Sequence, residues 1–103
     1  MPSLIEALAY LGIDYADESV RRNVARSLRA AEGVLRGAVG DDVAVYLPED
    51  PRVNELVLIY LDDLYSERGV NAKVSGATRR LVESMETQLR LELRRRKEEA
   101  GAS

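Results

Sequence analysis

The first forty residues constrain the fold most, because they encode two helices joined by a turn that reverses the chain. Ser3 and Glu6 have the spacing of a capping box, in which each side chain binds a backbone N–H left free at a helix start. Three leucines then share one helical face, and Gly12 can take the left-handed conformation that ends a helix. Asp14 or Asp17 can cap a second helix. The pattern therefore predicts a helical hairpin.

The second predicted helix has an apolar stripe on one face and a basic surface on the other. Its apolar residues recur at spacings of three and four, as in an amphipathic helix: Val20, Val24, Leu28, Ala31, Leu35 and Ala38. The opposite face carries five arginines: Arg21, Arg22, Arg26, Arg29 and Arg36. These arginines can be interpreted as a solvated helix face or as a contact surface for another subunit or an anion.

A third helix is expected from Pro51 to Gly69, with Asp50 as its cap, because the missing N–H of proline is harmless at the first helical position. Its centre, residues 56–61, is apolar around most of the circumference, which is typical of a helix buried on several sides. Residues 40–49 are expected to form an ordered loop.

The end of the chain is predicted to form a linker followed by a helical arm. Small and polar residues at 70–77 predict the linker, and the last helix is expected to start at Ser75 or Thr78. This helix has a narrow apolar stripe and then a basic run: Leu81, Val82, Met85, Leu89 and Leu93, followed by Arg94, Arg95, Arg96 and Lys97. The sequence therefore predicts an all-α bundle of about four helices. A three-helix core spans residues 1–69, and an arm over 78–103 is expected to pack weakly on it.

Composition excludes several functional classes. The 103 residues suffice for one domain, and the absence of cysteine and histidine removes disulfide frameworks, zinc fingers and histidine-based catalysis. The adjacent acid pairs, Asp41-Asp42 and Asp62-Asp63, would point about 100° apart on a helix rather than at one ligand. We therefore expect no catalytic residues, no metal site, no cofactor and no enzymatic activity. Neither a membrane-spanning run nor a secretory leader is indicated.

Charge is distributed unevenly along a chain of net charge −3. Residues 39–69 hold eight acids and two arginines, a local charge of −6, whereas residues 76–97 hold seven basic and three acidic residues, a local charge of +4. The basic end could supply phosphate contacts to nucleic acid, but it lacks aromatic side chains on which bases could stack. A small helical DNA-binding or antitoxin-like regulator therefore remains an alternative, as does a host-encoded helical dimerisation module.

Two segments carry a family resemblance. Residues 6–40 combine a short helix ending in a Tyr10-Leu11-x-Ile13-Asp14 turn, an acidic cap at Asp17 and a long helix with paired alanines at 30 and 31. Residues 48–69 form a proline-started apolar helix that closes in Tyr65, Glu67 and Arg68. In these features the chain resembles the phage head-tail connector (adaptor) family, small helical proteins of head completion and DNA packaging.

The resemblance implies a structural virion protein without enzymatic activity. It would form a homo-oligomeric ring beneath the portal vertex, matching the portal's twelvefold symmetry, and extend the DNA channel toward the tail. The implied partners are further copies of the chain, the portal protein, a tail or stopper protein and double-stranded DNA that passes non-specifically, with no membrane. The implied location is the virion neck, after synthesis in the host cytoplasm. Rings of this kind are built from head-to-tail contacts.

Three candidate surfaces follow on this hypothesis. The subunit interface is expected at Arg21, Arg22, Arg26, Arg29 and Arg36. The channel lining is expected at Asp41, Asp42, Asp62 and Asp63, where negative charge would let DNA phosphates pass without sticking. Portal docking is expected through the arm, with Leu81, Met85, Leu89 and Leu93 as apolar anchors and Arg94, Arg95, Arg96 and Lys97 supplying charge.

Overall fold

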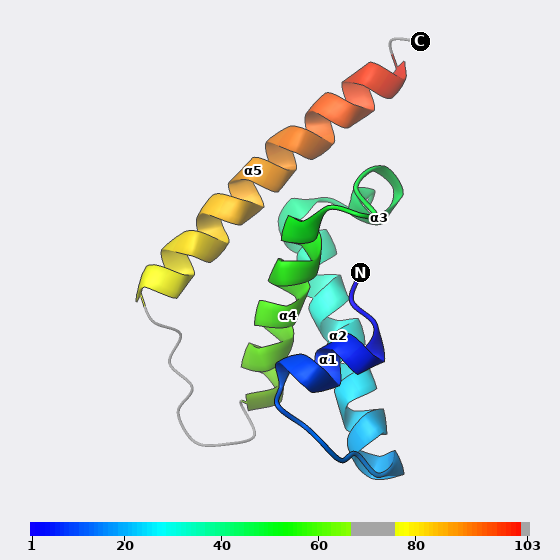
Figure 1. Ribbon diagram of the computed structural model, residues 1–103. Helices are drawn as coiled ribbons and strands as arrows, with labels where there is room; N and C mark the ends of the chain where they lie inside the picture. Colours follow the sequence, from blue (N-terminus) through cyan, green and yellow to red (C-terminus); the bar gives the residue numbers. More distant parts are fainter. Residues whose placement is uncertain (67–75, 102–103) are drawn as a thin grey trace.

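The chain is all-α, as the sequence predicts. A computed structural model describes residues 1–66 and 76–101, and these residues form five helices and no strand (Figure 1). The helices are α1 (Leu4–Tyr10), α2 (Glu18–Val39), α3 (Val43–Tyr46), α4 (Pro51–Ser66) and α5 (Gly76–Gly101). Helices α2 and α4 run antiparallel as the central pair, α1 packs against both, and α5 passes diagonally across them (Figure 1).

The predicted hairpin between α1 and α2 forms as expected. The capping box is present, since the Glu6 N–H donates to Ser3 Oγ (3.1 Å) and the Ser3 N–H donates to Glu6 Oε1 (3.3 Å). At the other end of α1, Gly12 has φ +73° and its N–H donates to the Ala9 carbonyl, while the Ile13 N–H donates to the Leu8 carbonyl. This pair of bonds is a Schellman motif, which a glycine adopts without steric cost.

Helix α2 begins at a predicted cap and buries four of the six residues of its predicted stripe, whereas Val20 and Ala38 are partly buried. Asp17, rather than Asp14, accepts the Val20 N–H at 2.8 Å. The fully packed side chains on α2 are Val24, Leu28, Ala31, Leu35 and Val39, and those on α4 are Val53, Leu56, Val57 and Leu61. Because each buried Leu or Val contributes about 1.5–3 kcal/mol, this helix pair forms the centre of the core.

A short helix occupies the segment that was expected to be a loop. Residues 43–46 form the single turn α3, with the Leu47 N–H donating to the Val43 carbonyl at 2.8 Å. Val43 and Leu47 are buried, at 0% and 4% exposure. Their four-residue spacing places both side chains on the core side of one turn, so tertiary burial stabilises a helix too short to show a periodic pattern.

The start of α4 is also as predicted, because Asp50 Oδ1 accepts the Arg52 N–H at 2.9 Å directly before Pro51 begins the helix. The predicted end at Gly69, and residues 70–75 of the predicted linker, lie outside the described residues. Gly76 and Ala77, assigned to the linker, belong to α5.

Helix α5 packs against the other helices more closely than predicted for an arm that is separate from a three-helix core. Leu89 and Leu93 are buried, at 0% and 5% exposure, and Val82 and Met85 pack against the same cluster. Weak packing of the arm is therefore a wrong expectation for its middle section. The C-terminal end of α5 does extend beyond α3 (Figure 1), and the molecule measures 48 × 31 × 18 Å.

Candidate interaction surfaces

The described residues offer no candidate metal site and no candidate membrane-spanning helix. Among residues 1–66 and 76–101, no three acidic side chains converge as they would around a metal ion. Within the same part of the chain, no helix combines the length and apolarity needed to cross a membrane. The candidate functional sites described below are surfaces and surface pockets.

The arginine face of α2 consists of Arg21, Arg22, Arg26, Arg29 and Arg36, all of them exposed. Arg22 makes one contact, 3.5 Å from Glu18 across a highly exposed pair that contributes little to stability. The other four have no ion-pair partner within residues 1–66 and 76–101. Gly33 and Gly37 lie on the same side of the helix, with open space around them. The arginine face is thus exposed and cationic, and the contact of Arg22 with Glu18 is its one ion pair among the described residues.

The four acids proposed as a channel lining do not lie together in one protomer. Asp41 and Asp42 lie between α2 and α3, whereas Asp62 and Asp63 are near the opposite end of α4. A 16-residue helix is about 24 Å long, so most of the length of α4 separates the two pairs. Asp42 also pairs with Lys97 Nζ at 2.9 Å. A single protomer therefore presents no continuous acidic strip made from these four residues.

The apolar anchors proposed for portal docking differ in how deeply they are buried. Leu89 and Leu93 are inside the core and Met85 is partly buried, whereas Leu81 is 54% exposed. Leu89 and Leu93 cannot meet a partner while α5 stays in place, which corrects their assignment as docking anchors. Periodicity identified the apolar stripe of α5 correctly but could not say whether its partner was this chain or another.

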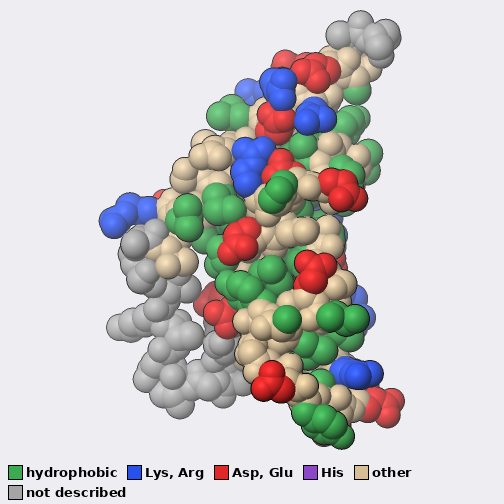
Figure 2. Space-filling view, in the orientation of Figure 1, with side chains coloured by type: hydrophobic (Ala, Val, Ile, Leu, Met, Phe, Trp, Pro, Cys, Tyr) green, Lys and Arg blue, Asp and Glu red, His purple; other side chains and the backbone are tan. Residues whose placement is uncertain are grey.

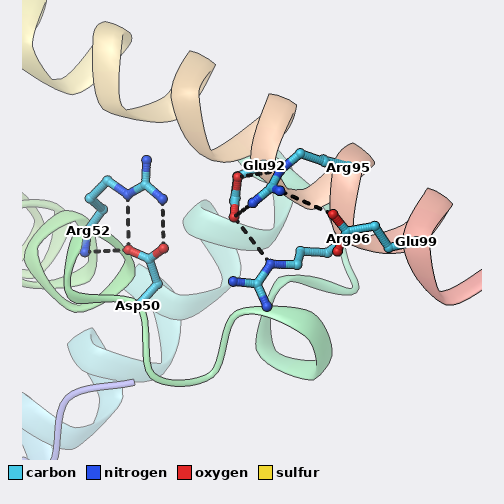
Figure 3. Close-up of polar contacts among 6 residues, drawn as sticks. All are labelled: Asp50, Arg52, Glu92, Arg95, Arg96 and Glu99. Carbon is cyan, nitrogen blue, oxygen red and sulfur yellow. Dashed lines mark hydrogen bonds and ion pairs between the residues drawn. The ribbon is translucent and has the colours of Figure 1, made fainter.

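Most of the basic run on α5 is neutralised within the chain (Figure 3). Glu92 Oε1 lies 2.7 Å from Arg95 Nη2 and 3.2 Å from Arg96 Nε, and Arg95 Nη1 lies 3.1 Å from Glu99 Oε1. Hydrogen bonds from Arg95 and then Arg96 lower the pKa of Glu92. Lys97 forms an ion pair with Asp42. Arg94 is therefore the one residue of the basic run without an ion-pair partner among the described residues.

Two polar contacts have no counterpart in the sequence predictions. Asp50 binds the Arg52 guanidinium through both carboxylate oxygens, at 3.0 Å to Nε and 2.8 Å to Nη2 (Figure 3), and these hydrogen bonds hold the pKa of Asp50 below its usual range. Asp50 also lines a pocket of about 270 Å³ with Arg96 of α5. The close sequence spacing of Asp50 and Arg52 is a signal that could have identified the first pair.

The second unpredicted contact joins α4 to α5. The Tyr60 hydroxyl donates to Glu86 Oε2, and burial together with this acceptor raises the pKa of Tyr60. The two residues are 26 positions apart, so no local pattern could have paired them. The bond is one of the contacts that hold α5 against α4.

A basic pocket of about 450 Å³ opens where the end of α2 meets α5. Its lining consists of Val39, Gly40, Arg90, Leu93, Arg94, Lys97 and Glu98. Arg90 Nη1 donates to the Ala38 carbonyl at 2.8 Å and Nη2 donates to Thr87 Oγ1 at 3.1 Å, so its guanidinium is held in place. Gly40 has φ +148°, and a Cβ there would lie 2.6 Å from Leu93 Cδ2. The pocket therefore depends on a glycine at the end of α2.

Comparisons with models of protein families, with curated proteins and with solved structures find no match for this chain.

Proposed function

We propose that this protein is a structural component of a phage neck, which assembles as a ring between the portal and the tail and extends the DNA channel. The proposal rests on the family resemblance of residues 6–40 and 48–69 and on one observation, the arginine face of α2. Four of its five guanidinium groups have no acidic partner within the described residues. Arginine suits protein interfaces because its planar fork binds carboxylates in pairs.

Complementary charge is present elsewhere on the same protomer. Helix α4 exposes Glu55, Asp62 and Asp63, and it carries no exposed lysine or arginine after its first turn. In a two-fold dimer built on one face, that face contacts the same face of the partner. The basic face would then meet arginines and the acidic face would meet carboxylates, so neither charge would be neutralised. They favour a head-to-tail contact, which closes into a ring when the rotation between copies divides a full turn.

We propose that the contacts with portal and tail involve exposed apolar side chains of α3 and α5. Leu81 and Leu91 are 54% and 60% exposed on α5, and Val45 is 73% exposed on α3. These side chains replace the buried Leu89 and Leu93 as candidates for apolar contact with a partner. The acids of α4 remain proposed as a channel lining contributed by several protomers around the ring.

The test is the assembly state of the purified protein. Negative-stain electron microscopy and mass photometry are expected to show closed rings. The double variant Arg26→Glu, Arg29→Glu should lose them because it places acids against the acidic surface of the neighbour. The matched double variant Arg26→Lys, Arg29→Lys keeps the charge and should retain assembly. Unchanged ring yield in the charge-reversed protein, with normal helicity by circular dichroism, would remove the arginine face from the interface.

The alternative of a DNA-binding regulator receives less support from the same contacts. Its basic terminus would have to bind phosphates, but Arg95, Arg96 and Lys97 are each paired with a carboxylate of this chain. When fewer cations are available to contact phosphates, fewer counterions are released from the DNA, and the protein binds DNA more weakly. Retention on duplex DNA that falls steeply with salt would favour the regulator over the ring.

A further inference from the structure

Tyr15 is presented on the surface in an unusual way. It is 87% exposed, more than any other large apolar side chain that the structure describes. The backbone on either side of it is fixed, by the Schellman turn at Gly12 and by the Asp17 cap of α2. The exposed carboxylate of Asp14 precedes it directly. Because the backbone around it is already ordered, binding through Tyr15 costs little additional backbone entropy, which suits this residue as an interface anchor.

The basic pocket has the complementary chemistry. Three cationic side chains, Arg90, Arg94 and Lys97, surround it with one acid, Glu98, and Val39 and Leu93 contribute apolar surface. The Lys97 ammonium pairs with the Asp42 carboxylate of its own chain at 2.9 Å, whereas Arg94 has no ion-pair partner among the described residues. Arginine and lysine side chains also attract the face of a tyrosine ring. The volume of about 450 Å³ falls within the range of roughly 300–1,000 Å³ typical of binding sites.

These two features lie at opposite ends of one helix. Tyr15 precedes α2 and the basic pocket begins at its last residue, and 22 helical residues span about 33 Å. Figure 1 shows the start of α2 at the lower end of the molecule and the C-terminal half of α5 at the upper end. At the lower end, apolar, acidic and basic side chains are exposed close together (Figure 2). The pocket therefore cannot be filled by the tyrosine of its own chain.

We propose that Tyr15 of one copy inserts into the basic pocket of the next copy, with Asp14 pairing with Arg94. This inference rests on the proposed function, because it names the contact through which neighbouring copies join. Arg94 is available for the pair, since it has no ion-pair partner within residues 1–66 and 76–101. The contact uses different patches on its two sides, so it is head-to-tail and can repeat around a ring.

The surroundings of the pocket favour this occupant over a phosphate. The C-terminal end of α2 carries the negative pole of the helix dipole, and Glu98 adds a carboxylate at the rim. A doubly charged anion would be repelled by both. A tyrosine ring with one adjacent carboxylate instead uses the apolar surface of Val39 and Leu93 and needs a single cationic partner.

The experiment measures association of the full-length chain by sedimentation velocity over a range of concentrations. Tyr15→Ala is expected to weaken association roughly 30-fold or more, the effect of losing an interface hot spot. Tyr15→Phe keeps the ring and is the matched control, expected to assemble normally. Asp14→Arg and Arg94→Asp should each weaken association, and the two changes combined should restore it. Circular dichroism and thermal melting verify folding, which these exposed positions should not affect.

A second experiment uses the absence of cysteine from the chain. Single variants Ala16→Cys and Glu98→Cys, which keep Tyr15, Asp14 and Arg94, are mixed and mildly oxidised. A disulfide dimer containing one of each variant is expected, whereas neither variant alone should cross-link efficiently. If the wild type assembles while Tyr15→Ala assembles equally well and the mixed disulfide is absent, this inference is overturned and the proposed ring stands. A wild-type chain that stays monomeric at every concentration overturns both.

Discussion

Replacing Leu89 by alanine tests directly whether α5 belongs to the core. The Leu89 side chain has 0% exposure and joins a cluster supplied by α2, α3 and α4. Truncation of a fully buried leucine removes its transfer free energy and leaves a cavity, which together cost about 2–5 kcal/mol. We expect a loss of about 3 kcal/mol in the free energy of unfolding, a large fraction of the roughly 5–15 kcal/mol typical of a domain.

The assay is urea and thermal unfolding followed by far-ultraviolet circular dichroism. A loss of about 3 kcal/mol should lower the melting temperature by roughly 12 to 24 °C in a domain of this size. Leu81→Ala is the matched control, since it makes the same chemical change on the same helix at a side chain that is 54% exposed. Its effect should stay within about 0.5 kcal/mol.

Deleting residues 77–103 extends the same test. The deletion removes Leu89 and Leu93 from the core together with the Tyr60–Glu86 and Asp42–Lys97 contacts, so the remainder should be markedly less stable. The result that would refute this reasoning is a Leu89→Ala protein within about 1 kcal/mol of wild type and a truncated chain that melts at the wild-type temperature. Helix α5 would then behave as an independent arm, with its apolar stripe reserved for a partner.

Three further outcomes are expected from stability measurements. Gly40→Ala should destabilise by about 1–3 kcal/mol in urea unfolding, because φ is +148° and the new Cβ would lie 2.6 Å from Leu93 Cδ2; a neutral effect would contradict this packing. Gly33→Ala and Gly37→Ala should each stabilise the monomer by about 0.5–1 kcal/mol, since both sites are open and helical; destabilisation of the monomer would show that these sites are not open. Because the folded pKa of Asp50 is lowered, its contribution to stability is present above the unfolded value, roughly 3.9, and is lost as the pH falls through the folded pKa. Asp50→Asn should therefore lower stability at neutral pH and flatten the acid limb of the stability curve, and an unchanged acid limb would argue against this role.

The local rules of helix formation account for the parts of the fold that could be predicted. The capping box at Ser3, the turn at Gly12 and the proline start of α4 depend on residues within five positions of one another. The stripe on α2 was predicted from periodicity, and Val24, Leu28, Ala31 and Leu35 are buried as expected. The same periodicity placed the five arginines on the solvent side, which remains the strongest sequence indication of an interaction surface.

Tertiary structure alone decided where the last third of the chain packs and which charges are available. An apolar stripe on α5 indicates burial but does not name the partner, because hydrophobic attraction has no direction of its own. Pairs such as Tyr60–Glu86 and Asp42–Lys97 join residues far apart in sequence, and they exist only once α4, α3 and α5 have packed. The basic pocket likewise needs the end of α2 against α5. The sequence by itself determined α1, α2, α4 and α5, their caps and their apolar faces through short-range interactions, whereas long-range packing stabilised α3 and determined which faces stay exposed.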